Sequence, residues 1–128
     1  MSSITPNAEQ FRELAASAEE GPVVMLNLLK FKAGDGAQEY DAYGSAASKM
    51  VAEGGGRVLY IGRCDQVLIG DDSQAWDAIA LVEYPSRGAF IEMVSRKDYQ
   101  QAHTHREAGL ERTVLLATTP QSRSSSKG

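Results

Sequence analysis

Apolar runs bounded by turn residues predict four strands along the chain. Residues 23–29 are apolar apart from one Asn and begin with two valines, which is typical of a central strand buried on both faces. Residues 57–70 hold two strand-like stretches around a polar break, so we expect one bent or bulged strand there. Residues 76–84 predict a third strand that Pro85 ends, and residues 110–118 predict the last one.

Apolar residues at helical spacing predict one helix before the first strand and another after it. Thr5 is a suitable N-cap for the leading helix, with Pro6 in its first turn and residues 21–22, Gly-Pro, beyond its end. The second helix is expected to start near Ala37. The three glycines at residues 54–56 must end it.

The third predicted helix is broken into two halves. Ser86 is a good N-cap for the first half, and residues 95–98 resemble a capping box that restarts the helix. Gly109 ends the second half. Four residues of that half share one face at helical spacing: Tyr99, Ala102, His103 and Arg106.

The order of these elements predicts an α+β fold. After the leading helix, the order strand, helix, strand, strand, helix, strand is that of a ferredoxin-like βαββαβ sandwich. Right-handed crossovers place both helices on one face of the sheet. The other face then needs a cover, so we expect a second copy of the chain to pack there, giving a homodimeric α+β barrel.

The length of the chain supports only one hydrophobic core. We therefore expect residues 1–120 to form a single domain with an extra N-terminal helix. Residues 121–128 lack apolar side chains that could anchor them, which predicts a flexible C-terminal tail.

Charge and apolar run length disfavour several classes of partner. Thirteen Lys and Arg against 17 Asp and Glu give a net charge of −4, without a basic run that could bind nucleic acid. The longest apolar run is far shorter than the roughly 20 residues of a membrane span. The first 20 residues do not resemble a secretion signal. We therefore expect a cytoplasmic protein that binds neither nucleic acid nor membrane.

The metal-ligating residue types are sparse. The single Cys64 can form neither an internal disulfide nor a cysteine-based zinc cluster, and its apolar surroundings predict a buried, inert thiol rather than a reactive one. His103 and His105 are two positions apart, roughly 200° around a helix, so they cannot both face one metal ion. We predict no metal site.

A recurring set of residues resembles a known family. The most specific part is the segment 83–86, Glu-Tyr-Pro-Ser, followed by Ser95 and Tyr99 in a Ser-x-x-x-Tyr pattern. The other residues that carry the resemblance are Gly55, Gly56, Arg57, Gly62, Arg63, Trp76, Leu81, Val82, Ala89, Phe90 and Arg106. Over roughly residues 23–117 the chain thus resembles the family catalogued as domain of unknown function 1330.

The resemblance implies the fold of the dimeric α+β barrel superfamily. That superfamily also includes cofactor-free monooxygenases, haem-degrading enzymes, dye-peroxidase relatives and muconolactone-isomerase-like proteins. The family itself brings no activity, and a shared fold is a weak guide to chemistry. The helix before the first strand departs from the family's usual outline.

Two polar residues on predicted strands are candidates for ligand binding. Asn27 lies among apolar neighbours and needs hydrogen-bond partners, so it either orients a ligand or satisfies backbone groups at a strand irregularity or dimer seam. Arg63 ends a strand, where its guanidinium can hold a carboxylate or enolate at a cavity rim. Alternatively, Arg63 pairs with Asp77 or Glu83 across the hairpin.

The second half of the broken helix and the third strand supply three further candidates. His103 can act as an acid or base, because its ordinary pKa is about 6.5, and Arg106 can bind an anion beside it. Alternatively, both only stabilise the C-terminal end of the helix. Trp76 is expected to share a strand face with Ala78 and Ala80, which leave room for a ligand or for a closely packed helix.

Two functional hypotheses follow, and the sequence leaves open whether the protein is an enzyme. The first is an enzyme without a cofactor that acts on a small, partly apolar organic acid or aromatic, with His103 moving a proton and Arg63 or Arg106 binding the anion. The second is a non-catalytic dimer that binds a metabolite or another protein.

Overall fold

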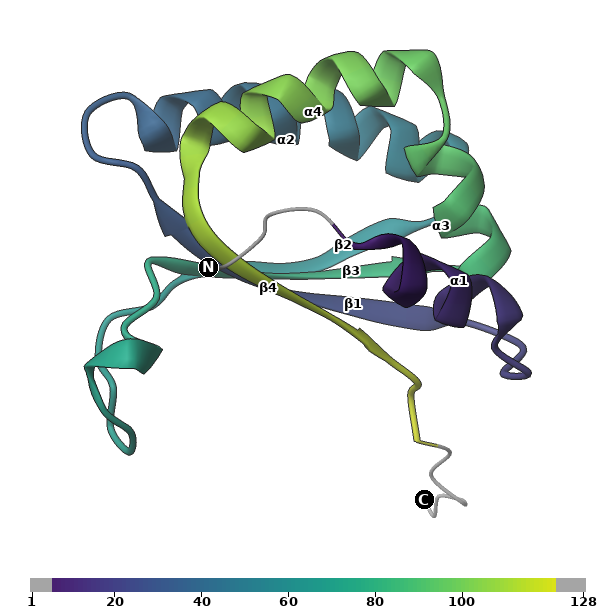
Figure 1. The fold of residues 1–128 in the computed structure, drawn as a ribbon, viewed down its shortest axis with the longest axis horizontal. Helices are drawn as coiled ribbons and strands as arrows, with labels where there is room; N and C mark the ends of the chain where they lie inside the picture. The colour runs from purple at the N-terminus through teal and green to yellow at the C-terminus, as the bar shows by residue number, and fades with distance from the viewer. Residues whose placement is uncertain (1–5, 122–128) are drawn as a thin grey trace.

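The computed structural model describes residues 6–121, which form one four-stranded sheet with helices α2 and α4 side by side over one of its faces (Figure 1). The elements in chain order are α1 (Ala8–Ala16), β1 (Val23–Phe31), α2 (Gly36–Glu53), β2 (Arg57–Arg63), η1 (Asp72–Gln74), β3 (Ala78–Tyr84), α3 (Arg87–Val94), α4 (Lys97–Gly109) and β4 (Leu110–Thr118). The strand order is β2-β3-β1-β4, and every neighbouring pair is antiparallel. The predicted α+β class and βαββαβ order are confirmed.

The register of the sheet determines which residues face the helices. On β1 these are the odd-numbered residues, since Val23, Met25 and Leu29 are each at most 3% exposed. Their partners on β3 include Tyr84 and Val82, so the same face continues across the sheet. The core between the sheet and the helices comprises Val23, Met25, Met50, Val51, Tyr84, Phe90, Met93, Tyr99 and Ala102.

The opposite face of the sheet is also apolar, and helices α2, α3 and α4 do not cover it (Figure 1). We call this surface the open face. It is formed by alternate residues of all four strands: Val24, Leu26, Leu28, Tyr60, Ile79, Leu81, Val114 and Leu116. Tyr60 is 55% and Leu116 is 48% exposed, which is unusual for apolar residues in the centre of a strand.

The leading helix α1 is capped differently from the prediction. Asn7 is its N-cap, and Asn7 and Gln10 form a reciprocal capping box, with 2.7 Å from the Gln10 amide to Asn7 Oδ1. The predicted cap Thr5 lies outside the described residues. No residue of α1 is buried, but Leu14 packs against the core, and α1 lies beside α3 (Figure 1).

The predicted strand over residues 57–70 is too long. β2 ends at Arg63, which pairs with Ala78, the first residue of β3. Beyond that point the chain has no strand to pair with, and residues 64–77 form a loop in which Leu68 is 83% and Ile69 is 93% exposed. The bulge that we expected does occur, but within β2, between Val58 and Tyr60.

The break in the third helix is confirmed, although its chemistry differs from the prediction. Ser86 caps α3 by accepting a hydrogen bond from the Ala89 amide at 3.0 Å. The predicted capping box at residues 95–98 is wrong, because α4 is capped by Arg96 without a side-chain bond. The carboxylate of Asp98 instead accepts hydrogen bonds from the Arg96 guanidinium and from the Tyr99 amide.

Candidate functional site

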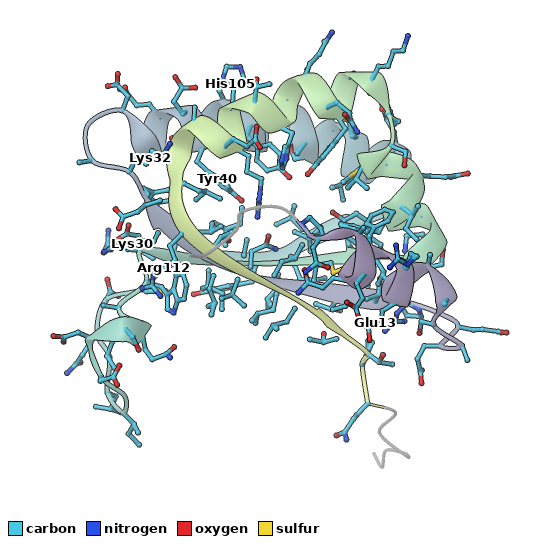
Figure 2. All side chains as sticks on the ribbon, in the orientation of Figure 1. Glu13, Lys30, Lys32, Tyr40, His105 and Arg112 are labelled. Atoms are coloured by element: carbon cyan, nitrogen blue, oxygen red, sulfur yellow. The ribbon has the colours of Figure 1, made fainter. Side chains whose placement is uncertain are left out.

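An open cavity of about 1850 Å³ lies between the sheet and the helices that cover it. β1 contributes Asn27 to its lining, and α2 contributes Tyr40 and Tyr43. From α4 come Tyr99, His103 and Arg106, and α1 reaches the same cavity with Phe11 and Leu14. Figure 2 shows Tyr40 on the inner side of the helix layer and His105 on its outer side. The inner faces of α2 and α4 are therefore where polar groups meet an apolar cavity.

Three tyrosines form a chain of contacts along the two helices. The rings of Tyr40 and Tyr43 lie 5.3 Å apart, and the Tyr43 and Tyr99 hydroxyl oxygens lie 2.9 Å apart. Burial raises the pKa of Tyr40 to about 12, and it also raises the pKa of Tyr43 and Tyr99. The three phenols therefore stay protonated near neutral pH.

Arg106 places a positive charge inside this cluster. The residue is 5% exposed, and its guanidinium carbon lies 6.0 Å from the centre of the Tyr43 ring, a cation–π arrangement. The charge of Arg106 partly opposes the rise in the pKa of Tyr40 that burial causes. The wall formed by Arg106 and the tyrosines is rich in donors, as an anion-binding site requires.

His103 lies one turn beyond Tyr99, and their rings are 5.9 Å apart. Its Nε2 lies 3.8 Å from Glu107 Oε2, whereas its Nδ1 is buried and has no hydrogen-bond partner among the described residues. Burial lowers the pKa of His103, and the positive charge of Arg106 lowers it further, while Glu107 opposes both effects. The ring is therefore neutral near pH 7 and able to accept a proton.

Asn27 shares the helix-facing side of β1 with Met25 and Leu29. Its Nδ2 donates to the carbonyl oxygens of Ala80 at 3.2 Å and Met25 at 3.4 Å. The amide thus satisfies strand carbonyls, as one of the two sequence hypotheses stated, and both bonds hold the side chain in one orientation. Asn27 also lines the cavity, so its Oδ1 is a pre-oriented acceptor.

Arg63 lies at the solvent-exposed edge of the cavity, apart from the His103 cluster. Its side chain is 85% exposed and pairs with Asp65 at 2.9 Å. The predicted ion pairs with Asp77 or Glu83 are wrong. Glu83 pairs with Arg57 at 2.9 Å, because the bulge in β2 brings these two residues opposite each other.

Trp76 is not in a strand, because β3 begins two residues later. Its ring lies under the guanidinium of Arg112, 4.0 Å from the ring centre, and its Nε1 donates to Gln74 Oε1 at 3.4 Å. Trp76 is not among the residues that line the cavity. The structure thus separates it from Ala78 and Ala80, which do line the cavity.

Cys64 follows the last residue of β2 and is half-buried rather than buried, and its amide donates to the carbonyl of Asp77 at 2.9 Å. Within residues 6–121 no group of three or more His, Cys, Asp or Glu side chains is placed to hold a metal ion. None of the helices in that range is long and apolar enough to cross a membrane.

The sequence does not predict the role of Tyr40 and Tyr43, since their helical spacing indicates only the inner face of an amphipathic helix. Two tyrosines at positions i and i+3 place two hydroxyl groups on the same helix face, and this pattern in the sequence indicates hydrogen bonding at that face. Which residue each hydroxyl meets depends on how α2 packs against α4.

Known structures share this fold. The chain is similar to a protein of unknown function from Rhodopseudomonas palustris, with 34% identity and a TM-score of 0.87 over 95% of this chain and 99% of that chain. It is also similar to a proposed antibiotic biosynthesis monooxygenase from Caulobacter crescentus, with 15% identity and a TM-score of 0.63 over 80% and 92% of the two chains.

A third similar structure is a dimeric protein of unknown function with a ferredoxin-like fold from Bacteroides fragilis. Here the identity is 10% and the TM-score 0.56, over 79% of this chain and 98% of that chain. No curated protein matches the sequence. Residues 28–119 match the model of one family, described as a domain of unknown function, and the chain therefore belongs to the DUF1330 family.

Proposed function

We propose that the protein is an enzyme that acts on a small, partly apolar organic acid or aromatic bound in the cavity between the sheet and helices α2 and α4. The observation that carries this proposal is that His103, Arg106 and Asn27 line the same cavity. A few polar side chains that converge on a mostly apolar cavity are typical of a binding site for a small ligand.

The chemistry of the cavity wall supports an anionic or enolisable substrate. In this proposal Arg106 and the protonated tyrosines stabilise the negative charge of the bound substrate. A neutral His103 beside them can remove a proton from the substrate as the charge develops. General base catalysis of this kind contributes roughly 10²–10⁴ in rate.

The roles of the individual residues follow from their positions. In this proposal His103 is the catalytic base, and Arg106 and Asn27 bind the substrate, Arg106 through charge and Asn27 through its Oδ1. Arg63 is assigned to the entrance, where its exposed guanidinium attracts an anion. Trp76 lies in the loop of residues 64–77, outside the cavity. In this proposal it contacts only a ligand that extends beyond the cavity.

The open face supports a second proposal, that two copies of the chain pair through their sheets. Its apolar residues extend over all four strands, and Tyr60 and Leu116 are about half exposed. A similar protein from Bacteroides fragilis is described as dimeric. Most residues that line the cavity lie on the other side of the sheet, although Val114 and Leu116 of the open face also line it.

Native mass spectrometry of gently purified protein tests the first proposal. We expect a small organic molecule to be retained by the wild type and lost from Arg106→Met. A candidate substrate identified in this way should be turned over by the wild type but not by His103→Gln. Retention of the molecule without turnover would instead support the alternative function, a non-catalytic metabolite-binding module.

A further inference from the structure

We propose that Phe11 of α1 determines which ligands the cavity accepts, by contacting the apolar end of an organic acid whose anionic end lies beside Arg106. This inference rests on the proposed function of the cavity and adds the part of the ligand that α1 recognises. Phe11 takes no part in proton transfer in this scheme. Its effect is on the choice of ligand.

One side of α1 lines the cavity. Four lining residues follow the helical spacing i, i+3, i+4, i+7, which places them on the same side of the helix: Asn7, Gln10, Phe11 and Leu14. Glu13 does not line the cavity, and Figure 2 shows it on the side of α1 turned away from α2 and α4. α1 therefore presents one defined side to a ligand.

The surface that this side of α1 offers is apolar. The side-chain oxygens of Asn7 and Gln10 accept hydrogen bonds from each other's backbone amides, at 2.7 and 3.0 Å, so the helix itself satisfies them. Leu14 packs against the core and holds α1 in place. Phe11 is partly exposed and, among the described residues, is not one that packs against the core. The Phe11 ring is therefore available to a molecule that occupies the cavity.

The cavity joins this apolar surface to a polar one. His103 and Arg106 of α4 line the same cavity, and Arg106 brings a buried positive charge to its wall. A ligand with a carboxylate at one end and an apolar group at the other complements both surfaces. Because each methylene that moves from water into apolar contact improves affinity roughly 4-fold, the size of the apolar group should control binding.

The two surfaces come from different parts of the chain. The family model matches residues 28–119, which include α2 and α4 but not α1. The βαββαβ unit begins with β1 and excludes α1 as well. The polar groups of α2 and α4 thus belong to the segment that defines the family, and α1 adds the apolar surface to it. An added element of this kind can change the preferred ligand while the polar groups stay the same.

Isothermal titration calorimetry of the full chain with benzoate and 4-butylbenzoate tests this inference, because the two acids differ only in the apolar butyl group. We expect the wild type to bind 4-butylbenzoate at least about 10-fold more tightly than benzoate. In Phe11→Ala this preference should shrink by about 3–10-fold, while the affinity for benzoate stays nearly the same. Phe11→Leu keeps an apolar side chain and should retain most of the preference. Glu13→Ala, on the other side of α1, should retain all of it, and thermal unfolding checks that each variant is folded.

Two results would overturn this inference and leave the proposed function standing. One is a preference for 4-butylbenzoate that is the same in Phe11→Ala and wild type. The other is an equal loss of affinity for both acids in Phe11→Ala, because Phe11 would then only support the fold. If neither acid binds the wild type, α1 adjoins no site for an acid, and the proposed function is refuted together with this inference.

Discussion

The hydroxyl oxygens of Tyr43 and Tyr99 lie 2.9 Å apart, and this hydrogen bond joins α2 to α4 beside the cavity. Their rings meet edge to face, at 81° and with 5.9 Å between centroids. Because burial raises the pKa of both phenols, the bond persists through the neutral pH range. It fixes the helix that carries His103 against the helix that carries Tyr40.

Removing either hydroxyl should destabilise the protein. Tyr43→Phe or Tyr99→Phe leaves one buried hydroxyl without its partner, at a cost of about 1–3 kcal/mol in the free energy of unfolding. The double variant should cost less than the sum of the two, because both remove the same bond. Urea denaturation measures the free energy of unfolding of the two single variants and the double variant, with Tyr60→Phe on the open face as a control. Strictly additive losses of this free energy would contradict a shared hydrogen bond.

His103 should make the stability of the protein depend on pH. Its pKa is lowered in the folded state by burial and by Arg106, so the unfolded chain binds more protons below its ordinary value of about 6.5. The free energy of unfolding should therefore fall as the pH drops from 7 through this value toward the lower folded pKa. Urea denaturation at several pH values measures this free energy, which should decrease less between pH 7 and pH 5 in His103→Gln than in the wild type. An equal decrease in both proteins would contradict the burial of the His103 ring.

Gly109 allows the C-terminal end of α4 to approach the start of α2. A Cβ atom there would lie 2.6 Å from the Gly36 carbonyl oxygen and 2.9 Å from the Tyr40 amide nitrogen, both of them backbone atoms that cannot easily move. We expect Gly109→Ala to cost about 1–3 kcal/mol, as overpacked substitutions do.

A matched variant on α2 should have the opposite effect. Gly44 lies within α2, and nothing lies within 4 Å of a Cβ atom added there. Gly44→Ala should stabilise the protein by up to about 1 kcal/mol, because alanine is the better helix former. Thermal unfolding of both variants checks the pair. Equal destabilisation would show that the close helix approach is not the cause.

The open face should control the association of two copies. Leu116→Lys places a charge in the apolar surface that two sheets would bury, so we expect it to convert a dimer into a monomer. Leu68→Lys is the control, since Leu68 lies in the loop of residues 64–77 and is already 83% exposed. Light scattering measures both masses, and a wild-type monomer would contradict the pairing.

Local sequence patterns predicted most of the fold because each pattern has its cause nearby. The valines at the start of β1 and the Ser86 cap of α3 act through their own neighbours, and both predictions are confirmed. The prediction that the second strand continues to residue 70 was wrong for the opposite reason. A strand needs a partner, and β3 begins opposite Arg63, so apolar residues such as Leu68 have no strand to pair with.

The sequence predicted which residues belong to the candidate site but not which of them contact each other. Helical spacing correctly placed His103 and Arg106 on one face of α4, and the need of Asn27 for hydrogen-bond partners among apolar neighbours predicted its bonds to backbone carbonyls. The bond between Tyr43 and Tyr99 joins residues 56 positions apart and depends on how two helices pack, which no local pattern encodes. Arg63 likewise pairs with Asp65, two residues along the chain in the loop that follows β2, and not with a residue of β3.

In the proposed function, a small organic acid or aromatic binds beside His103 and Arg106. A titration of ¹⁵N-labelled protein with a panel of aromatic carboxylates and phenols, followed through the His103 ring and the Asn27 side-chain amide, tests it most directly. We expect at least one compound to shift both signals, and we expect Arg106→Met to abolish the shifts. Arg57→Met, at the exposed start of β2, should keep them. Compounds that shift neither signal, or only residues of the open face, would contradict it.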